Sequence, residues 1–351
     1  MDDPIFIIGT ERSGTNLLRL ILNAHSGIAV PHPPHIVKFF HPLLPLYGDL
    51  NEDGNFRRLA GDVCRLVELH PYSWEMRPDR EKVLKNAKAR DLISIYFEVY
   101  EQYRLHVGKR RWACKSTFMI EHVEDVLRYR PEAKFIYMAR DGRDVAVSAK
   151  TSIFNRYHAY YVAQLWSREQ RLGLSWLSQL PPERIMLLKY EDLLRDPAAA
   201  TEHLCDFLGE RFEKRMLDYH FSDEASKSGS LSLSWKNTSR PVMRDNSGKF
   251  RRLLSEKEVL LFEAVAGEEL KGLGYDLTFS EPVLAKERVA RGNPRLSYRV
   301  EDTFLRIKAE AKHILSDKST SDRLRKLGYL RYLRLLRGAR RLAGSLAGGL
   351  F

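Results

Sequence analysis

Residues 6–19 read FIIGTERSGTNLLR, an apolar run followed by a loop between Gly9 and Gly14 and then by a helical pattern. The apolar run predicts a buried strand, and the pattern after Gly14 predicts a helix over about residues 15–24. A tight loop between a strand and a helix directs several backbone N–H groups and the positive end of the helix dipole at one point. The sequence therefore predicts a cradle for an anion such as a phosphate.

The spacing of the two glycines matches the nucleotide-triphosphate loop G-x-x-x-x-G-K-[ST], but the side chains that complete that loop are missing. Thr15 stands at the lysine position and Asn16 at the Ser/Thr position. Nothing in the loop is therefore suited to reach β- and γ-phosphates or Mg²⁺, and its own cation is Arg12. Taken alone, the loop is also compatible with a glycine turn in any α/β protein.

The Arg-Ser-Gly-Thr sequence of this loop, followed by a leucine-rich helix, resembles the 5′-phosphosulfate loop of sulfotransferases that use 3′-phosphoadenosine 5′-phosphosulfate (PAPS). The resemblance implies a set of residues that hold the 5′-phosphosulfate, namely Arg12, Ser13, Gly14, Thr15 and Asn16. It extends from about Pro4 to Tyr275, and beyond that point no family pattern is recognisable.

A second match lies at residues 139–148, which read ARDGRDVAVS after an apolar run. Sulfotransferases use a strand, an arginine, a turn and a helix of this form, ending in Asp-Val-x-x-Ser, to hold the 3′-phosphate. Arg140 offers a planar fork of donors at the strand end, and Ser148 adds a hydroxyl two helical turns later. We expect Asp144 to cap the start of the helix.

Three further segments resemble the family. Tyr190 stands where a tyrosine usually lies near the adenine ring, and the resemblance implies that Ser247, Gly248 and Lys249 return to the 3′-phosphate. Lys115 follows a short apolar run, where the family directs a lysine at the transferring sulfuryl group. Structural roles are the alternatives: Lys115 would stand at a strand edge, as lysines often do, and Tyr190 would pack in the core, as buried tyrosines usually do.

Residues 31–35 read PHPPH, and three prolines in this span exclude regular structure. Bacterial and Golgi-type sulfotransferases carry here an acidic residue that deprotonates the acceptor hydroxyl, but no Asp or Glu stands between Arg19 and Asp49. The base would therefore be His32 or His35, since imidazole titrates near neutral pH. His35 is slightly favoured, because related loops often place a histidine before an apolar pair. A surface turn with solvated histidines is the alternative.

Four apolar runs read as strands, near residues 5–8, 112–115, 134–138 and 185–188. Each is followed by a helical pattern, which indicates a parallel sheet with helices on both faces. We predict an α/β fold with a P-loop NTPase-like parallel sheet, in which a domain of residues 1–278 carries a helical insertion at about 55–108 and a basic helical extension covers 279–351. The Ser- and Gly-rich residues 222–236 are expected to form a flexible loop over the site.

The whole chain has 351 residues, 44% of them apolar and 30% charged, which is typical of a soluble globular protein of one or two domains. Its three cysteines, Cys64, Cys114 and Cys205, are far apart, which argues against a disulfide framework and for a reducing compartment. We found no signal-peptide pattern and no long apolar segment. A cytoplasmic location is therefore expected, with contact to a membrane surface as an open possibility.

The formal net charge of +12 is concentrated in residues 318–351, which hold nine Lys or Arg side chains and one acid. The remaining excess is too small to argue for binding to nucleic acid. In a helical projection of residues 330–346, the apolar side contains Tyr332, Leu335, Leu336, Ala339, Leu342, Ala343 and Leu346. The other side contains Arg331, Arg334, Arg337, Arg340 and Arg341, with Leu330 and Leu333 as exceptions. Such a helix suits an anionic membrane surface, or its apolar side docks on the protein itself or on a second subunit.

The resemblance implies transfer of a sulfuryl group from PAPS to a hydroxyl or amine of an acceptor, with release of PAP and without a metal. The protein would position the reactants, while Lys115 stabilises the charge growing on the bridging oxygen. The acceptor, a glycan, a lipid or a small molecule, and the oligomeric state do not follow from the sequence. The alternatives are a P-loop kinase-like phosphotransferase, which the missing Lys-Ser/Thr pair disfavours, and an inactive nucleotide-binding protein of the same fold.

Overall fold

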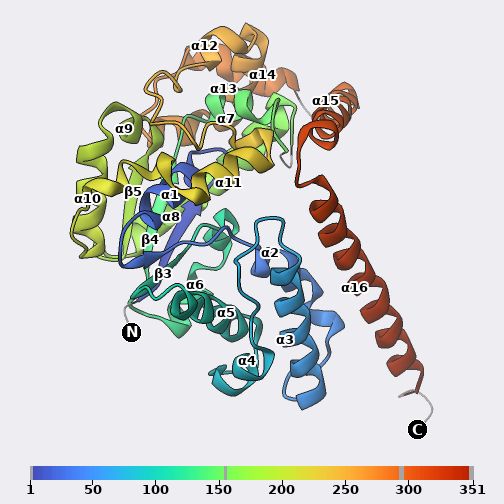
Figure 1. The fold of residues 1–351 in the computed structure, drawn as a ribbon. Coiled ribbons are helices and arrows are strands. Elements are labelled where there is room, and N and C mark those ends of the chain that lie inside the picture. The colour runs from blue at the N-terminus through green and yellow to red at the C-terminus, as the bar shows by residue number, and fades with distance from the viewer. Residues whose placement is uncertain (1–2, 154–155, 292–295, 348–351) are drawn as a thin grey trace. The chain divides into compact units, whose positions relative to one another are not determined.

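The computed structural model describes residues 3–153, 156–291 and 296–347, without the side chains of 290–291 and 337–347 (Figure 1). It divides into two compact units. Among the described residues, the first unit contains 3–4, 26–133 and 319–347, and the second contains 5–25 and 134–318. The domain boundary near residue 278 stays a prediction. The described residues between 279 and 318 belong to the second compact unit.

The second unit is built on three parallel strands, β1 (Ile5–Gly9), β4 (Lys134–Ala139) and β5 (Ile185–Lys189), in the order β1-β4-β5. Ile7 pairs with Ile136, which pairs in turn with Met186. Every residue of β1 is buried, as expected for a parallel strand that is covered on both faces. The predicted parallel arrangement is confirmed for these strands.

The helices of this unit include α1 (Thr15–Asn23), α7 (Gly142–Ala149), α8 (Ala159–Gln179), α9 (Tyr190–Arg195), α10 (Pro197–Leu208) and α13 (Glu256–Gly272). α13 packs along α8 (Figure 1), with the rings of Phe262 and Trp166 5.8 Å apart. α13 ends at Gly272 with Leu273 as its C-cap; Gly274 follows with a φ of +71°, and the amide of Tyr275 donates to the carbonyl of Leu270 at 2.8 Å. Gly274 is therefore the left-handed residue of a Schellman-type helix end.

The prediction of a flexible loop at residues 222–236 is wrong, because most of this segment is helical. It forms α11 (Asp223–Leu231) and η5 (Leu233–Trp235). The hydroxyl of Ser222 accepts the amide of Ala225 at 3.2 Å and so caps α11. The hydroxyl of Thr238 donates to the carbonyl of Ala225 at 3.1 Å. Serines that suggest a loop by composition serve here as caps and as small buried residues.

The first unit contains the parallel pair β2 (Ile28–Ala29) and β3 (Arg111–Cys114). Its helical elements are α2 (Ile36–Phe40), η1 (His41–Leu46), α3 (Asp53–Glu68), α4 (Arg80–Asn86), α5 (Leu92–His106), η2 (Thr117–Glu121) and α6 (Val123–Tyr129). The predicted helical insertion is therefore confirmed. Tyr96, Tyr100 and Trp112 pack ring to ring in its buried centre, with the rings of Tyr96 and Tyr100 4.8 Å apart.

In the described residues after Tyr275 the structure has three helices: α14 (Glu281–Arg291) and α15 (Leu296–Ser316) in the second unit, and α16 (Thr320–Ala347) in the first. α16 buries Lys326, Leu330 and Leu333, and the hydroxyl of Tyr329 donates to Asp62 of α3 at 3.0 Å. No helix in the described ranges is both long enough and apolar enough to span a bilayer.

The buried face of α16 differs from the apolar side of the sequence projection, as far as its side chains are described. Leu330 and Leu333, its two exceptions, are the buried residues, whereas Tyr332 is 56% exposed and Leu335 is 76% exposed. The remaining side chains of that projection lie outside the described ones: Arg337, Ala339, Arg340, Arg341, Leu342, Ala343 and Leu346.

Candidate functional site

The loop after β1 has the backbone that an anion cradle requires. Gly9, Arg12 and Gly14 all have positive φ, at +132°, +72° and +85°. A Cβ on Gly9 would lie 2.3 Å from the carbonyl oxygen of Met138, and one on Gly14 would lie 2.2 Å from the ring of Tyr190. Only glycine fits at these two positions, because the neighbouring strand and the tyrosine ring approach the loop so closely.

Three polar atoms at this loop and at the end of β4 are buried without a hydrogen-bond partner among the described residues: Ser13 Oγ, Asn16 Nδ2 and Arg140 Nε. Arg19 Nε donates to Asn16 Oδ1 at 2.8 Å, so the amide group of Asn16 is oriented with its Nδ2 unpaired. Unpaired buried donors are costly and rare. Together with the positive end of α1, they fit an anionic ligand.

The two expected arginines meet in the second unit. Arg12 Nε donates to Ser148 Oγ at 3.1 Å, and Arg12 Nη2 donates to the carbonyl of Ser234 at 3.1 Å. Arg140 Nη1 donates to the carbonyl of Arg12 at 3.0 Å. Burial of the guanidinium and, second, the charge of Arg140 lower the pKa of Arg12 to about 10, which still leaves it charged at neutral pH. The structure thus brings Arg12, Arg140 and Ser148 together, while their assignment to the two ends of a ligand stays a prediction.

Asp144 does not cap its own helix, which corrects the sequence prediction. Asp141 is the N-cap of α7, and its Oδ1 accepts the amide of Arg143 at 2.9 Å. The carboxylate of Asp144 instead accepts the amides of Gly248 at 2.7 Å and Phe250 at 2.8 Å. Because a buried carboxylate needs such donors, Asp144 fixes the later segment against α7.

The segment at 246–250 thereby joins Arg140. Arg140 Nη2 donates to the carbonyl of Asn246 at 3.0 Å, and its guanidinium lies 4.5 Å from the centre of the Tyr190 ring. Asn246 also donates to the hydroxyl of Tyr190 and accepts from Lys249 Nζ, both at 2.6 Å. Ser247 is half-buried beside them. Sequence analysis missed Asn246, although it directly precedes the Ser-Gly-Lys motif.

In the first unit, the proline-rich loop presents His35 at the start of α2. His35 has a φ of +59°, and its Nδ1 lies 3.0 Å from the hydroxyl of Ser116, the residue after Lys115. Burial and then the charges of Lys115, Lys38 and Lys326 hold the pKa of His35 well below its usual range. The imidazole is therefore neutral at neutral pH and able to accept a proton.

His32 has a different environment. Its ring stacks on Tyr72 with the ring centres 4.0 Å apart, and its Nδ1 lies 3.2 Å from His70 Nε2. The indole of Trp74 donates to the backbone carbonyl of His32 at 2.7 Å. A ring packed among buried aromatic residues suits a structural role, so the geometry favours His35 as the candidate base.

Lys326, which sequence analysis did not consider, reaches the same loop from α16. Its Nζ donates to the carbonyl of Pro34 at 2.9 Å and lies 4.8 Å from the ring centre of Phe39. Burial, with a contribution from Lys38, lowers the pKa of Lys326 to about 7. No local pattern reveals this contact, because 292 residues separate the two partners.

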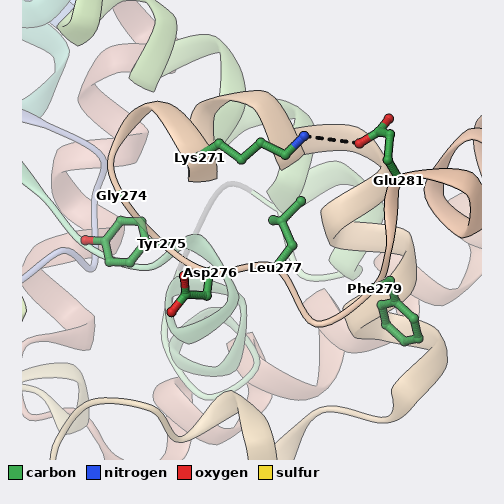
Figure 2. Close-up of a pocket in the computed structure, with 7 residues that line it drawn as sticks. All are labelled: Lys271, Gly274, Tyr275, Asp276, Leu277, Phe279 and Glu281. Atoms are coloured by element: carbon green, nitrogen blue, oxygen red, sulfur yellow. Dashed lines mark hydrogen bonds and ion pairs between the residues drawn. The ribbon is translucent and has the colours of Figure 1, made fainter.

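A separate surface hollow of about 400 Å³ is lined by Lys271, Gly274, Tyr275, Asp276, Leu277, Phe279 and Glu281 (Figure 2). Lys271 Nζ lies 3.1 Å from Glu281 Oε2 across its rim (Figure 2), so this cation already has a counterion. None of the residues predicted for the site lines this hollow, and we do not include it in the candidate site.

Comparison with known families matches residues 4–214 to the model described as "Sulfotransferase family". An uncharacterized protein of Aquifex aeolicus is 24% identical over 261 residues, which cover 71% of this chain and 30% of that protein. Sulfotransferase 2A6 of Rattus norvegicus is 29% identical over 175 residues, covering 45% of this chain and 55% of the rat protein. The chain thus matches only about a third to a half of these relatives.

Two solved structures share the fold. The sulfotransferase domain from the curacin biosynthetic pathway aligns with a TM-score of 0.51 at 21% identity, covering 79% of this chain and 99% of the domain. The sulfotransferase domain from the Synechococcus PCC 7002 olefin synthase aligns with a TM-score of 0.54 at 22% identity, covering 79% and 96%. At this identity the likeness concerns the fold alone.

Proposed function

Because the chain belongs to the sulfotransferase family, we propose that it transfers a sulfuryl group from PAPS to a hydroxyl or amine of an acceptor and releases PAP. The observation that carries the proposal is the set of unpaired buried donors, Ser13 Oγ, Asn16 Nδ2 and Arg140 Nε, beside the positive end of α1. Such donors fit a ligand rich in anionic oxygens.

The donor PAPS supplies the activated sulfuryl group. In our assignment the loop residues from Arg12 to Asn16 hold its 5′-phosphosulfate, and Arg140 with Ser148 holds its 3′-phosphate. Ser247, Gly248 and Lys249 complete the 3′ side, because Asp144 fixes their segment to α7. Tyr190 stacks against Arg140 and would keep that guanidinium aimed at the ligand.

On the acceptor side, His35 takes the proton of the acceptor hydroxyl as its oxygen bonds to sulfur. Ser116 orients the imidazole through Nδ1, which leaves Nε2 for this proton. As the bridging S–O bond breaks, its electron pair stays on the departing PAP oxygen, where the charge of Lys115 stabilises it. The acceptor class, a glycan, a lipid or a small molecule, stays open.

A thermal-shift comparison of PAP with ATP, ADP and GTP tests the proposal, followed by turnover of PAPS with and without EDTA. We expect selective stabilisation by PAP and turnover that chelation does not abolish. Loss of activity with EDTA and rescue by Mg²⁺ would favour the kinase alternative. PAP binding without turnover of any acceptor would favour the inactive nucleotide-binding protein.

The Arg140→Ala substitution tests the 3′-phosphate assignment. Loss of a charge-assisted contact of this kind should weaken PAP binding by roughly 2–5 kcal/mol. Unchanged PAP affinity in a folded variant would show that the second phosphate site is misassigned. AMP, which lacks the 3′-phosphate, serves as the control ligand, since its affinity should change much less.

A further inference from the structure

The guanidinium of Arg12 is hydrogen-bonded to the turn at residues 232–235, which consists of Ser232 and η5. Its Nη2 donates to the carbonyl of Ser234 at 3.1 Å, and its Nε donates to Ser148. A long arginine side chain has many rotamers, so the carbonyl that accepts its bond selects the orientation in which it faces a ligand. The position of this turn therefore matters for the cradle.

Asp317, directly after α15, holds this turn. Its Oδ2 accepts the hydroxyl of Ser232 at 2.8 Å, and its Oδ1 accepts the amide of Leu233 at 2.9 Å. The side chain of Asp317 is 3% exposed. Hydrogen bonds to a buried carboxylate are short and strong, so these two contacts define where the turn lies.

His313, one helical turn earlier on α15, holds Asp317 in its place. His313 is fully buried, its Nδ1 lies 2.8 Å from Asp317 Oδ2, and its Nε2 lies 3.3 Å from the carbonyl of Thr151. Both ring nitrogens thus face oxygen acceptors. The contacts form a continuous chain from α15 through the turn to Arg12, all within the second unit.

We propose that Asp317, oriented by His313, is a positioning residue for the phosphosulfate site, because it fixes the turn whose Ser234 carbonyl orients Arg12. This inference rests on the proposed function. It assigns a role in donor binding to the C-terminal extension, which lies outside the matched residues 4–214.

The Asp317→Ala variant tests the inference by the dissociation constant for PAP, measured by isothermal titration calorimetry. We expect affinity about tenfold weaker, equal to about 1.4 kcal/mol. Asp302→Ala is the matched control. Asp302 is a buried carboxylate on α15 that accepts the amides of Tyr157 at 2.7 Å and His158 at 2.9 Å; among the described residues, none of its hydrogen bonds or ion pairs is to residues 232–235. This control should bind PAP as the wild type does.

A double-mutant cycle separates positioning from a general loss of structure. Arg12→Lys keeps the charge but removes the guanidinium that reaches Ser234. If Asp317 acts through Arg12, adding Asp317→Ala to Arg12→Lys should change PAP affinity by less than about twofold. If Asp317→Ala weakens PAP binding tenfold both in the wild type and in Arg12→Lys, the inference is overturned.

Ser232→Ala keeps the test possible if Asp317→Ala does not fold, since it leaves the buried carboxylate in place. It removes the hydroxyl that donates to Asp317 and that also caps η5 by accepting the amide of Ser234 at 3.3 Å. It should weaken PAP binding about two- to fivefold in the wild-type background, which is the size expected for one modest hydrogen bond. Wild-type PAP affinity in folded Asp317→Ala or Ser232→Ala would overturn the inference while the proposed function stands. Failure of the wild type to bind PAP would overturn both.

Discussion

Replacing Gly14 by alanine is the sharpest single test of the cradle. Gly14 has a φ of +85°, and a Cβ there would lie 2.2 Å and 2.5 Å from two carbons of the Tyr190 ring. Gly209, the C-cap of α10, provides a matched control, because its φ is +71° and nothing lies within 4 Å of its Cβ position. Both substitutions place an alanine in a left-handed backbone conformation, but only Gly14→Ala also brings its Cβ into overlap with the Tyr190 ring.

The expected losses of stability follow from the backbone strain and from the steric overlap with Tyr190. A left-handed backbone costs a non-glycine residue about 1–2 kcal/mol, which applies to both variants. Forcing extra atoms into a packed site adds about 1–3 kcal/mol, which applies only to Gly14→Ala. The Tyr190 ring must also move from its place against Arg140, so Gly14→Ala alone should lose PAP affinity.

Urea denaturation measures the free energy of unfolding of both variants, and calorimetry measures their PAP affinity. We expect the free energy of unfolding to fall by about 2–5 kcal/mol in Gly14→Ala and by about 1–2 kcal/mol in Gly209→Ala. Equal losses in the two variants, together with wild-type PAP affinity in Gly14→Ala, would refute the close contact between the loop and Tyr190. A changed slope with urea would instead indicate an altered unfolded state.

His35→Ala should bind PAP normally but lose about 10²–10⁴-fold in turnover, the usual range for a general base, whereas full activity in it and a loss in His32→Ala would move the role to His32. The low pKa of His35 further predicts that turnover stays constant down through pH 6.5 and falls only in more acidic buffer; a fall centred at 6.5 would contradict it. Because the pKa of Lys326 is about 7 in the folded protein and about 10.4 when unfolded, the unfolded chain binds the extra proton between these values. The free energy of unfolding should therefore rise from pH 7 to 9 by about 1 kcal/mol per pH unit relative to Lys326→Met, and parallel pH dependences would argue against the burial of this amine. If α16 contacts an anionic membrane, the wild type should sediment with phosphatidylserine vesicles at low salt and the variant carrying Arg331→Glu and Arg334→Glu should not; equal sedimentation would exclude that role for its exposed face.

The parts of the site that follow from the sequence are those with a local physical cause. Gly9 and Gly14 mark close approaches of the backbone, and the apolar run before them marks a strand buried on both faces. Arg140 stands at the end of β4, where a parallel sheet places its ligands. Spacing and composition carry this information directly, so the glycine-bracketed loop, the arginine at a strand end and the strands β1, β3, β4 and β5 were predictable, whereas the two-residue strand β2 was not among the four predicted strands.

The errors arose where distant contacts decide the outcome. Asp144 occupies a first-turn position suited to capping, yet its carboxylate pairs with two amides more than 100 residues later. On α16, Tyr332 and Leu335 of the predicted apolar side are exposed, whereas Lys326, Leu330 and Leu333 share the face that is buried. Helical periodicity shows that a face exists, but the partner surface selects which face is buried.

The charges at the cradle connect the fold to the proposed reaction. Arg140 donates to the backbone carbonyl of Arg12, and the other hydrogen bonds of the two guanidiniums go to neutral oxygens. Asp144 is 3.7 Å from Arg140 but already accepts two backbone amides. The charge of Glu11 also acts on Arg12, and Glu191 interacts with Arg140, but at Arg12 the repulsion by Arg140 is larger than the attraction of Glu11, so positive charge remains there. A ligand with anionic groups at two points would offset this charge at both arginines, and PAPS carries a phosphosulfate and a 3′-phosphate in that way.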